Sequence, residues 1–213
     1  MKGLLVKDFR LLMQRKRSLI IIILCGLAMI LSTDASFYIG WMIMIGSLFA
    51  LSTIAYDEHD NCFPFLMTLP VSRKCYAFEK YLFGALIALA SWICGVVFYA
   101  LISSLRRTEF DLQGEMAVLS VMLLVPLLIL DFSIPFNLKY GSEKGRIYML
   151  VFWGVIFGAA FAVVRLVPSV KEFSFSGLPV SGASVVIAAL IVTAALTAAS
   201  VAWSVRIMEK KEF

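Results

Sequence analysis

Charged side chains are scarce in this chain of 213 residues: 15% are charged, whereas 62% are hydrophobic and the mean hydropathy is +0.94. Soluble domains carry about 25% charged and about 45–50% apolar residues. The shortage of charge therefore excludes an ordinary soluble domain and indicates a multi-pass membrane protein. The longest polar stretch, 56–80, is too short for a separate soluble domain, so we expect 1–213 to form a single transmembrane domain.

Catalytic motifs are also lacking. The sequence contains no Gly-rich phosphate loop, no H-E-x-x-H and no G-x-S-x-G pattern. The single histidine, His59, has no nucleophile beside it in the sequence. We therefore expect this chain not to be an enzyme and to carry no cofactor of its own.

The four cysteines do not form the pattern of a disulfide framework. Cys25 and Cys94 fall inside apolar segments. His59, Cys62 and Cys75 have a spacing that partly matches a zinc site, but a fourth ligand is missing. We therefore expect no metal site.

Six segments are apolar and about long enough to cross a membrane, which takes about 20 residues. They are 18–36, 37–55, 81–105, 116–136, 147–167 and 183–205. The polar stretch 56–80 cannot lie in lipid, because its charges and irregular backbone would be left unsatisfied there. The sequence thus predicts an all-α membrane protein with six transmembrane helices and an aqueous loop at 56–80.

The first 17 residues have an amphipathic pattern. At about 100° per residue, one helix face is apolar and the opposite face is polar. The apolar face holds Met1, Leu5, Phe9 and Leu12, and the polar face holds Lys7, Arg10 and Gln14. The pattern predicts an interfacial helix at 1–17 that lies flat on the membrane with basic residues toward anionic lipid. A disordered basic tail is the alternative.

The distribution of Lys and Arg predicts the orientation of the chain. With six spans, fifteen of these residues fall on the side of both termini and of the 56–80 loop, and four fall on the other side. Cytoplasmic segments of membrane proteins are enriched in Lys and Arg. Both termini and the 56–80 loop are therefore expected in the cytoplasm.

Two features inside the predicted spans have alternative explanations. Asp131 is an ionisable residue within 116–136, so it either faces a cavity or a partner, or reaches interfacial water because Pro126 and Pro135 bend the helix. The 183–205 span is rich in small residues, which allow helices to approach closely. Residues such as Ala188, Ala195 and Ala199 therefore indicate either internal packing or a seam between subunits.

Two loop sequences resemble those of a known family. Asp57-Glu58, the run from Leu69 to Lys74 and Lys80-Tyr81-Leu82 resemble the first cytoplasmic loop of bacterial type-2 ABC exporter permeases. The segment from Pro135 to Arg146 is similar to the small-permease branch that includes the phenol-soluble modulin exporters of Gram-positive bacteria. With the amphipathic N-terminal helix and the six spans, the resemblance covers the whole chain. It implies the type-2 ABC exporter permease architecture in a bacterial cell membrane.

The resemblance implies that the 56–80 loop holds a short coupling helix, which docks into a groove of a cytosolic ABC ATPase subunit. The implied ATPase-coupling residues are Asp57, Glu58, Phe63, Pro64, Phe65, Leu66, Leu69, Pro70, Arg73 and Lys74. The implied residues of the second cytoplasmic loop are Lys139, Gly141, Glu143, Lys144 and Arg146.

The coupling helix is expected at Pro64–Thr68. Proline suits the first turn of a helix, and a residue that precedes proline, as Leu69 does, disfavours helical geometry. The 63–67 segment is more apolar than is usual in the family, and an exposed apolar patch needs a partner or the membrane surface to cover it. We expect Phe63, Phe65 and Leu66 to anchor the ATPase, with Glu58 and Arg73 at the rim of the contact.

The implied function is that of the permease subunit of an ATP-driven exporter of amphipathic peptides or similar amphiphiles. ATP and Mg²⁺ would then bind the partner ATPase, a second copy or a sister permease would complete the path, and Asp131 would be a candidate for the translocation path. The alternative is a non-transporting immunity or sensory protein that binds peptides. A secondary transporter is expected to show internal repeats, and the sequence shows no clear repeat.

Overall fold

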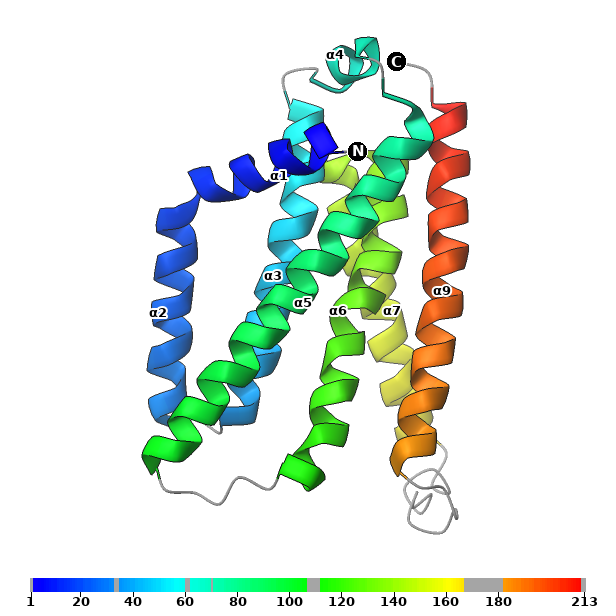
Figure 1. The fold of residues 1–213 in the computed structure, drawn as a ribbon. Helices are drawn as coiled ribbons and strands as arrows, with labels where there is room; N and C mark the ends of the chain where they lie inside the picture. Colours follow the sequence, from blue (N-terminus) through cyan, green and yellow to red (C-terminus); the bar gives the residue numbers. More distant parts are fainter. Residues whose placement is uncertain are drawn as a thin grey trace.

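The computed structural model describes residues 2–32, 35–59, 62–69, 71–106, 112–166 and 182–211. Its helices are α1 (Lys2–Gln14), α2 (Lys16–Ser32), α3 (Ala35–Glu58), α4 (Cys62–Thr68), α5 (Arg73–Arg106), α6 (Leu112–Tyr140), α7 (Ser142–Leu166) and α9 (Gly182–Lys210). The long helices run roughly along one direction, whereas α1 and α4 lie at one end of the bundle, where α9 also ends (Figure 1). We call this the α4 end.

Four of the described helices are long and apolar enough to cross a membrane. The qualifying segments are Ile39–Glu58 in α3, Arg73–Leu101 in α5, Met122–Tyr140 in α6 and Val186–Lys210 in α9. They correspond to four of the six predicted spans. The protein is therefore an all-helical, multi-pass membrane protein.

The two other predicted spans, 18–36 and 147–167, coincide largely with α2 and α7. With 17 residues, α2 is about 26 Å long, somewhat less than the roughly 30 Å of a hydrocarbon core. The 25-residue α7 is also not among the four qualifying segments of the described residues. The six-span count therefore stays a prediction.

The 56–80 loop is largely helical. The third helix continues to Glu58, and α5 begins at Arg73, eight residues before the predicted span at 81–105. Ser72 caps the first turn of α5, because its Oγ accepts the Cys75 N–H at 3.2 Å. Asp57, Glu58, Arg73 and Lys74 thus lie at helix ends, which fix their directions.

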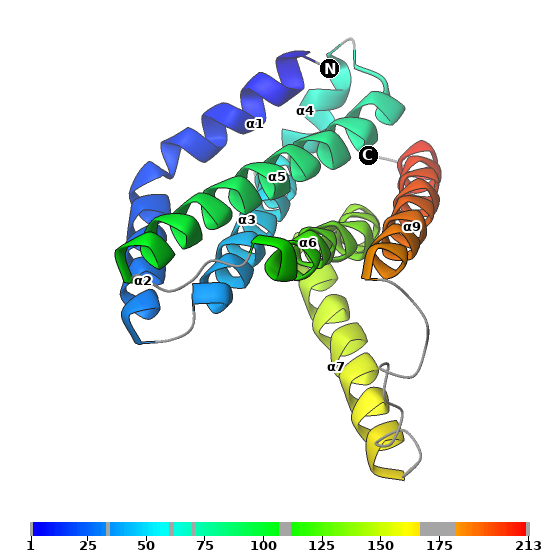
Figure 2. The same cartoon turned by 60° about the horizontal axis from the view of Figure 1, so that its bottom comes forward.

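The sequence predicted a connector at 137–146, but α6 continues to Tyr140 and α7 begins at Ser142, so that Gly141 alone joins them. This residue has φ = 82°, a left-handed conformation that glycine adopts without a steric penalty. Its N–H bonds the Asn137 carbonyl at 2.9 Å and closes α6. The next helix, α7, diverges from the rest of the bundle (Figure 2).

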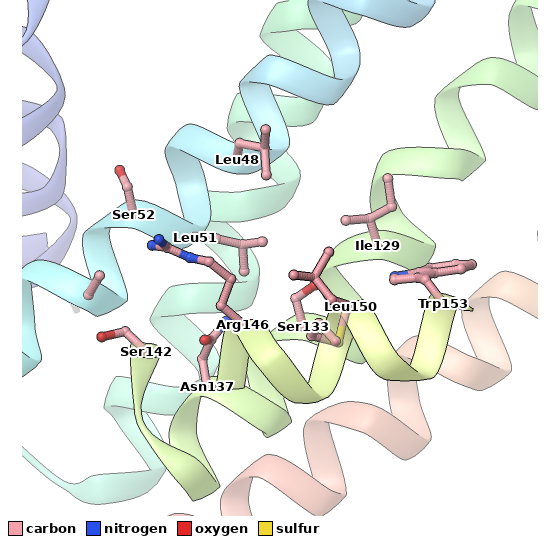
Figure 3. A pocket seen from close by; sticks show the side chains of 12 residues that line it. Leu48, Leu51, Ser52, Ile129, Ser133, Asn137, Ser142, Arg146, Leu150 and Trp153 are labelled. Atoms are coloured by element: carbon pink, nitrogen blue, oxygen red, sulfur yellow. The ribbon is translucent and has the colours of Figure 1, made fainter. Parts of the chain in front are cut away.

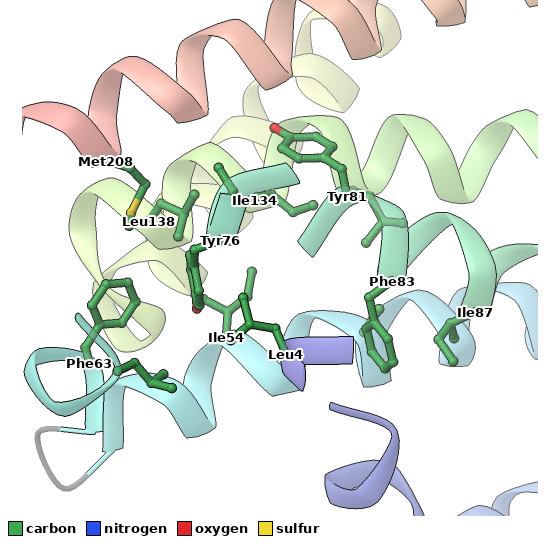
Figure 4. Packing of buried hydrophobic residues seen from close by; sticks show 14 residues of the cluster. Leu4, Ile54, Phe63, Tyr76, Tyr81, Phe83, Ile87, Ile134, Leu138 and Met208 are labelled. Atoms are coloured by element: carbon green, nitrogen blue, oxygen red, sulfur yellow. The ribbon is translucent and has the colours of Figure 1, made fainter. Parts of the chain in front are cut away.

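The main hydrophobic core lies toward the α4 end (Figure 4). Leu4 of α1, Tyr76 and Phe83 of α5, Ile134 of α6 and Met208 of α9 are all buried in it. Further along the bundle α3 crosses α5 closely at Gly46, where a Cβ atom would meet the Ser91 side chain. Helices remote in sequence are therefore held together most firmly where α4 sits.

A helix, α1, covers residues 2–14 of the segment 1–17, and its predicted apolar face is divided. Leu4 and Asp8 are buried, whereas Val6, Phe9 and Met13 are about half or more exposed. The edge of Phe9 still meets Phe83 of α5, with ring centroids 5.5 Å apart. One side of α1 thus packs on the protein and the other remains uncovered, and its interfacial position stays a prediction.

Candidate functional site

The short helix α4 contains the predicted coupling segment, 64–68, and begins two residues earlier, at Cys62. Phe63 and Leu66, three residues apart, are buried, and Phe63 meets the Tyr76 ring at 5.0 Å between centroids. Phe65 and Leu69 are 65% and 43% exposed. The expected anchor set is therefore divided: Phe63 and Leu66 fasten α4 to its own chain, and Phe65 points away from it.

Of the neighbouring residues named for the coupling surface, Pro64 is exposed beside Phe65. Pro70 lies outside the described residues. Among the side chains that the structure describes in α4 and just after it, Pro64, Phe65, Thr68 and Leu69 are exposed, and we call these four residues the α4 patch. Leu69, which the resemblance also named as a coupling residue, belongs to this patch.

Arg73 and Lys74 bind the end of α9. One Arg73 nitrogen, Nη1, donates to the carbonyl oxygens of Met208, Glu209 and Lys211, at 3.3, 3.0 and 2.9 Å. Lys74 Nζ lies 3.1 Å from a Glu209 carboxylate oxygen. A cation at the C-terminus of a helix stabilises the carbonyl groups that have no intrahelical donor. Arg73, which was expected at the rim of the ATPase contact, thus stabilises the end of α9 within this chain.

Glu58, the other expected rim residue, caps α7. Its carboxylate accepts the N–H of Ser142, the first residue of α7, and lies against Gly141. A carboxylate at a helix N-terminus is favourable because free N–H groups point toward it. A Cβ at position 141 would push the Glu58 carboxylate aside, and the left-handed backbone at this position independently favours glycine.

The structure thus brings the two predicted cytoplasmic loops together through Glu58 and Gly141. Of the other second-loop residues, Lys139, Glu143, Lys144 and Arg146 are exposed. Lys139 Nζ lies 4.9 Å from the centre of the Tyr140 ring. The sequence resemblance named both loops, but it did not indicate the contact between them.

Lys211, which the sequence reading did not single out, links α9 to two other elements. Its Nζ donates to the Leu138 carbonyl of α6 at 2.9 Å and lies 5.2 Å from the centre of the Phe63 ring of α4. Burial lowers the pKa of Lys211, and the charge of Glu58 opposes that shift. The back of α4 therefore rests on the ends of α5, α6 and α9.

Asp57 belongs to a buried network of charges that joins α1, α3 and α5. Lys80 Nζ lies 2.5 Å from Asp8 Oδ2, 2.7 Å from Asp57 Oδ2 and 3.2 Å from Thr53 Oγ1. Lys7 pairs with Asp57 and lies 3.2 Å from Asp8. The Tyr76 hydroxyl donates to Asp57 at 2.9 Å. Asp57 is 3% exposed, so it is unavailable to a partner in this arrangement.

Glu79 adds a third carboxylate to this network. It is fully buried, and its nearest cation is Lys80, with Nζ 3.9 Å from Oε2. Neither carboxylate oxygen receives a hydrogen bond within the described residues. The network, which we call the α1 anchor, comprises Lys7, Asp8, Thr53, Asp57, Tyr76, Glu79 and Lys80. Sequence reasoning named only Asp57 among its members for a functional role.

Asp131 is buried between α6 and α9 and is 5% exposed. Thr197 Oγ1 donates to its carboxylate at 2.7 Å, and the Ser200 hydroxyl donates to its backbone carbonyl. The Tyr81 hydroxyl bonds Ser200 Oγ at 2.6 Å and Ser204 Oγ at 2.8 Å. The hydroxyl face of α9 therefore packs against α5 and α6, whereas Ala188, Ala195 and Ala199 are exposed. The small-residue face is not the internal packing face.

Taken together, the membrane-spanning helices, the capped helix ends and the exposed apolar α4 patch define a multi-pass membrane protein with a prominent surface at one end. The family described as ABC-2 family transporter protein matches residues 3–209, nearly the whole chain. The protein therefore belongs to this family of transporter membrane proteins. Members are membrane subunits that work with a separate ABC ATPase. Neither the curated proteins nor the solved structures contain a match to this chain.

Proposed function

We propose that this chain is the permease subunit of an ATP-driven exporter and that the α4 patch binds the cytosolic ABC ATPase. The proposal rests on the observation that some apolar side chains of α4 are buried and others are exposed. Phe63 and Leu66 are buried against the ends of other helices, so that Phe65 and Leu69 are held outward. An exposed apolar patch on a rigid support favours a protein partner, because interface energy concentrates in a few buried apolar anchors.

Co-purification with the partner ATPase tests this function. We expect a stable complex in detergent or in nanodiscs, with ATP hydrolysis by the ATPase faster in the complex than in the isolated subunit. A chain that neither binds the ATPase nor changes its rate would contradict the proposal and would favour a non-transporting peptide-binding protein.

We further propose six spans with both termini in the cytoplasm of a bacterial cell. The support is the fifteen-to-four distribution of Lys and Arg. In a variant without native cysteines, a single cysteine placed in Arg106–Glu115 should react with an impermeant thiol reagent added to intact cells. A cysteine at 144, in the first turns of α7, should not react. Labelling at 144 would contradict the proposed orientation.

The cargo and the number of subunits extend this proposal. The resemblance to peptide exporters supports amphipathic peptides or similar amphiphiles as cargo, with Asp131 as a candidate for the path. The exposed small residues of α9 and the exposed apolar face of α7 support a second permease copy, identical or a sister chain. Export of a labelled peptide from proteoliposomes, compared between the native chain and Asp131→Leu, would test cargo and path together.

A further inference from the structure

A cavity of about 360 Å³ lies between α3, α6 and α7 (Figure 3). Its lining comprises Leu48, Leu51, Ser52, Ala55, Ile129, Ser133, Asn137, Ser142, Arg146, Met149, Leu150 and Trp153. The residues nearest the turn between α6 and α7 are mostly polar, and those further along the helices are apolar. The cavity is therefore amphiphilic, with its polar end toward the α4 end.

The polar end is rich in unused hydrogen-bond donors. The side chains of Ser133, Asn137, Ser142 and Arg146 have no hydrogen-bond or ion-pair partner within the described part of the chain. Ser133 is 3% exposed as a whole residue and lies at the wall of the cavity. A buried polar group normally has a hydrogen-bond partner. These side chains therefore offer hydrogen-bond donors to an acceptor in the cavity.

The charge of the cavity indicates that an anionic acceptor fits it. Arg146 is its cation, and none of the twelve lining residues is acidic. Figure 3 shows the Arg146 side chain reaching from α7 toward Ser52 of α3. The nearby Glu58 carboxylate is engaged by the Ser142 N–H and attracts Lys211, which offsets its charge. Arginine binds carboxylates and phosphates through two parallel hydrogen bonds, so an anionic head group fits this end.

The apolar end matches a hydrocarbon chain. Leu48, Leu51, Ile129, Leu150 and Trp153 line it, from all three helices. A single acyl chain carries no polar groups that would lose their hydrogen bonds there. A lipid with an anionic head group and an acyl chain therefore matches both ends of the cavity.

We propose that this cavity binds one anionic phospholipid from the leaflet at the α4 end. The phosphate lies on Arg146 and Asn137, and one acyl chain lies between α3 and α7. Basic pockets between transmembrane helices on the cytoplasmic side are a known form of anionic-lipid recognition. The bound lipid joins α7 to α3, two helices that otherwise touch little. This site depends on the proposed membrane orientation for the identity of its leaflet, but not on ATPase coupling.

Quenching of Trp153 fluorescence by brominated lipid tests the proposal. The probe is phosphatidylglycerol with brominated acyl chains, present at a low mole fraction in phosphatidylcholine nanodiscs that hold the full-length protein. The Trp153 signal is the difference between the native chain and Trp153→Phe. We expect half-maximal quenching at a mole fraction at least tenfold lower for brominated phosphatidylglycerol than for brominated phosphatidylcholine.

Arg146→Gln should remove this preference, and Lys144→Gln is the matched control. Both side chains are exposed on the first turns of α7, but only Arg146 lines the cavity, so both variants should fold. Equal quenching by the two lipids, or an undiminished preference in Arg146→Gln, would overturn the proposal. A signal that no lipid quenches would also overturn the proposal and would show that a second copy covers the cavity. Relief of quenching by an amphipathic peptide alone would show that the cavity binds cargo.

Because the fluorescence signal requires no ATPase, these outcomes are separate from failure of the proposed export function.

Discussion

Replacing Lys80 with methionine should destabilise the protein by about 3–5 kcal/mol, the usual cost of removing one partner from a buried ion pair. The side chain of Lys80 is 1% exposed, and its ammonium group contacts Asp8 and Asp57 directly. Methionine retains much of the apolar stem and removes the charge. Three buried carboxylates, Asp8, Asp57 and Glu79, would then share Lys7 as their cation within the described part of the α1 anchor.

Reversible unfolding in mixed micelles measures the loss. Lys74→Met is the matched control, because Lys74 is 63% exposed and forms a surface ion pair with Glu209, which is typically worth at most about 1 kcal/mol. Adding Asp8→Asn to Lys80→Met should restore part of the stability, since it removes one uncompensated charge. Equal losses in Lys80→Met and Lys74→Met would show that the α1 anchor does not stabilise the fold.

Combining Phe65→Ala with Leu69→Ala should strip the ATPase from the purified complex. Both side chains belong to the α4 patch, and at 65% and 43% exposure they have less burial to lose within this chain than Phe63 or Leu66. If they are central anchors, their truncation removes about 2–4 kcal/mol of binding energy, which corresponds to roughly 30-fold to 1000-fold weaker affinity. The measurement is a pull-down with a titrated ATPase, with the thermal stability of the permease as the check on folding.

Two control variants distinguish the loss of contact with the ATPase from the loss of packing beneath α4. Leu82→Ala also removes an exposed apolar side chain, but from α5 within the membrane, and should leave ATPase affinity unchanged. Phe63→Ala should reduce the stability of the permease itself, because Phe63 packs on Tyr76 under α4. Native ATPase affinity in the Phe65→Ala/Leu69→Ala variant would show that the α4 patch is not the docking surface and that it rests on lipid.

The sequence predicted features that depend on local composition. Apolar length identified the spans in α3, α5, α6 and α9, and proline placement located α4 to within two residues. The directions of side chains on α4 were missed because three- or four-residue spacing shows which residues share a face, but not which face is buried. Phe63 and Phe65 look equivalent until Tyr76 is placed beside one of them.

Long-range ionic contacts were beyond sequence reasoning for a related reason. Lys80 and Asp8 are 72 residues apart, and Arg73 binds a carbonyl 138 residues away. A lysine or an arginine next to a predicted membrane segment is normally explained by topology, so its charge carried no hint of a partner. The partners of these residues become visible only when α1 and α9 are placed against α5, as they are in the folded structure.

Gly141 forms a one-residue hinge between α6 and α7. One residue with a left-handed backbone joins two helices of 29 and 25 residues, and α7 diverges from the rest of the bundle (Figure 2), so a small rotation at Gly141 would move the far end of α7 by a large distance. The Glu58 carboxylate holds the near end, and Glu58 is also the last residue of α3 before α4. A rotation at the α4 end of α3 would therefore act on the start of α7 through the Glu58–Ser142 hydrogen bond, and a short displacement there would become a longer one at the far end of α7.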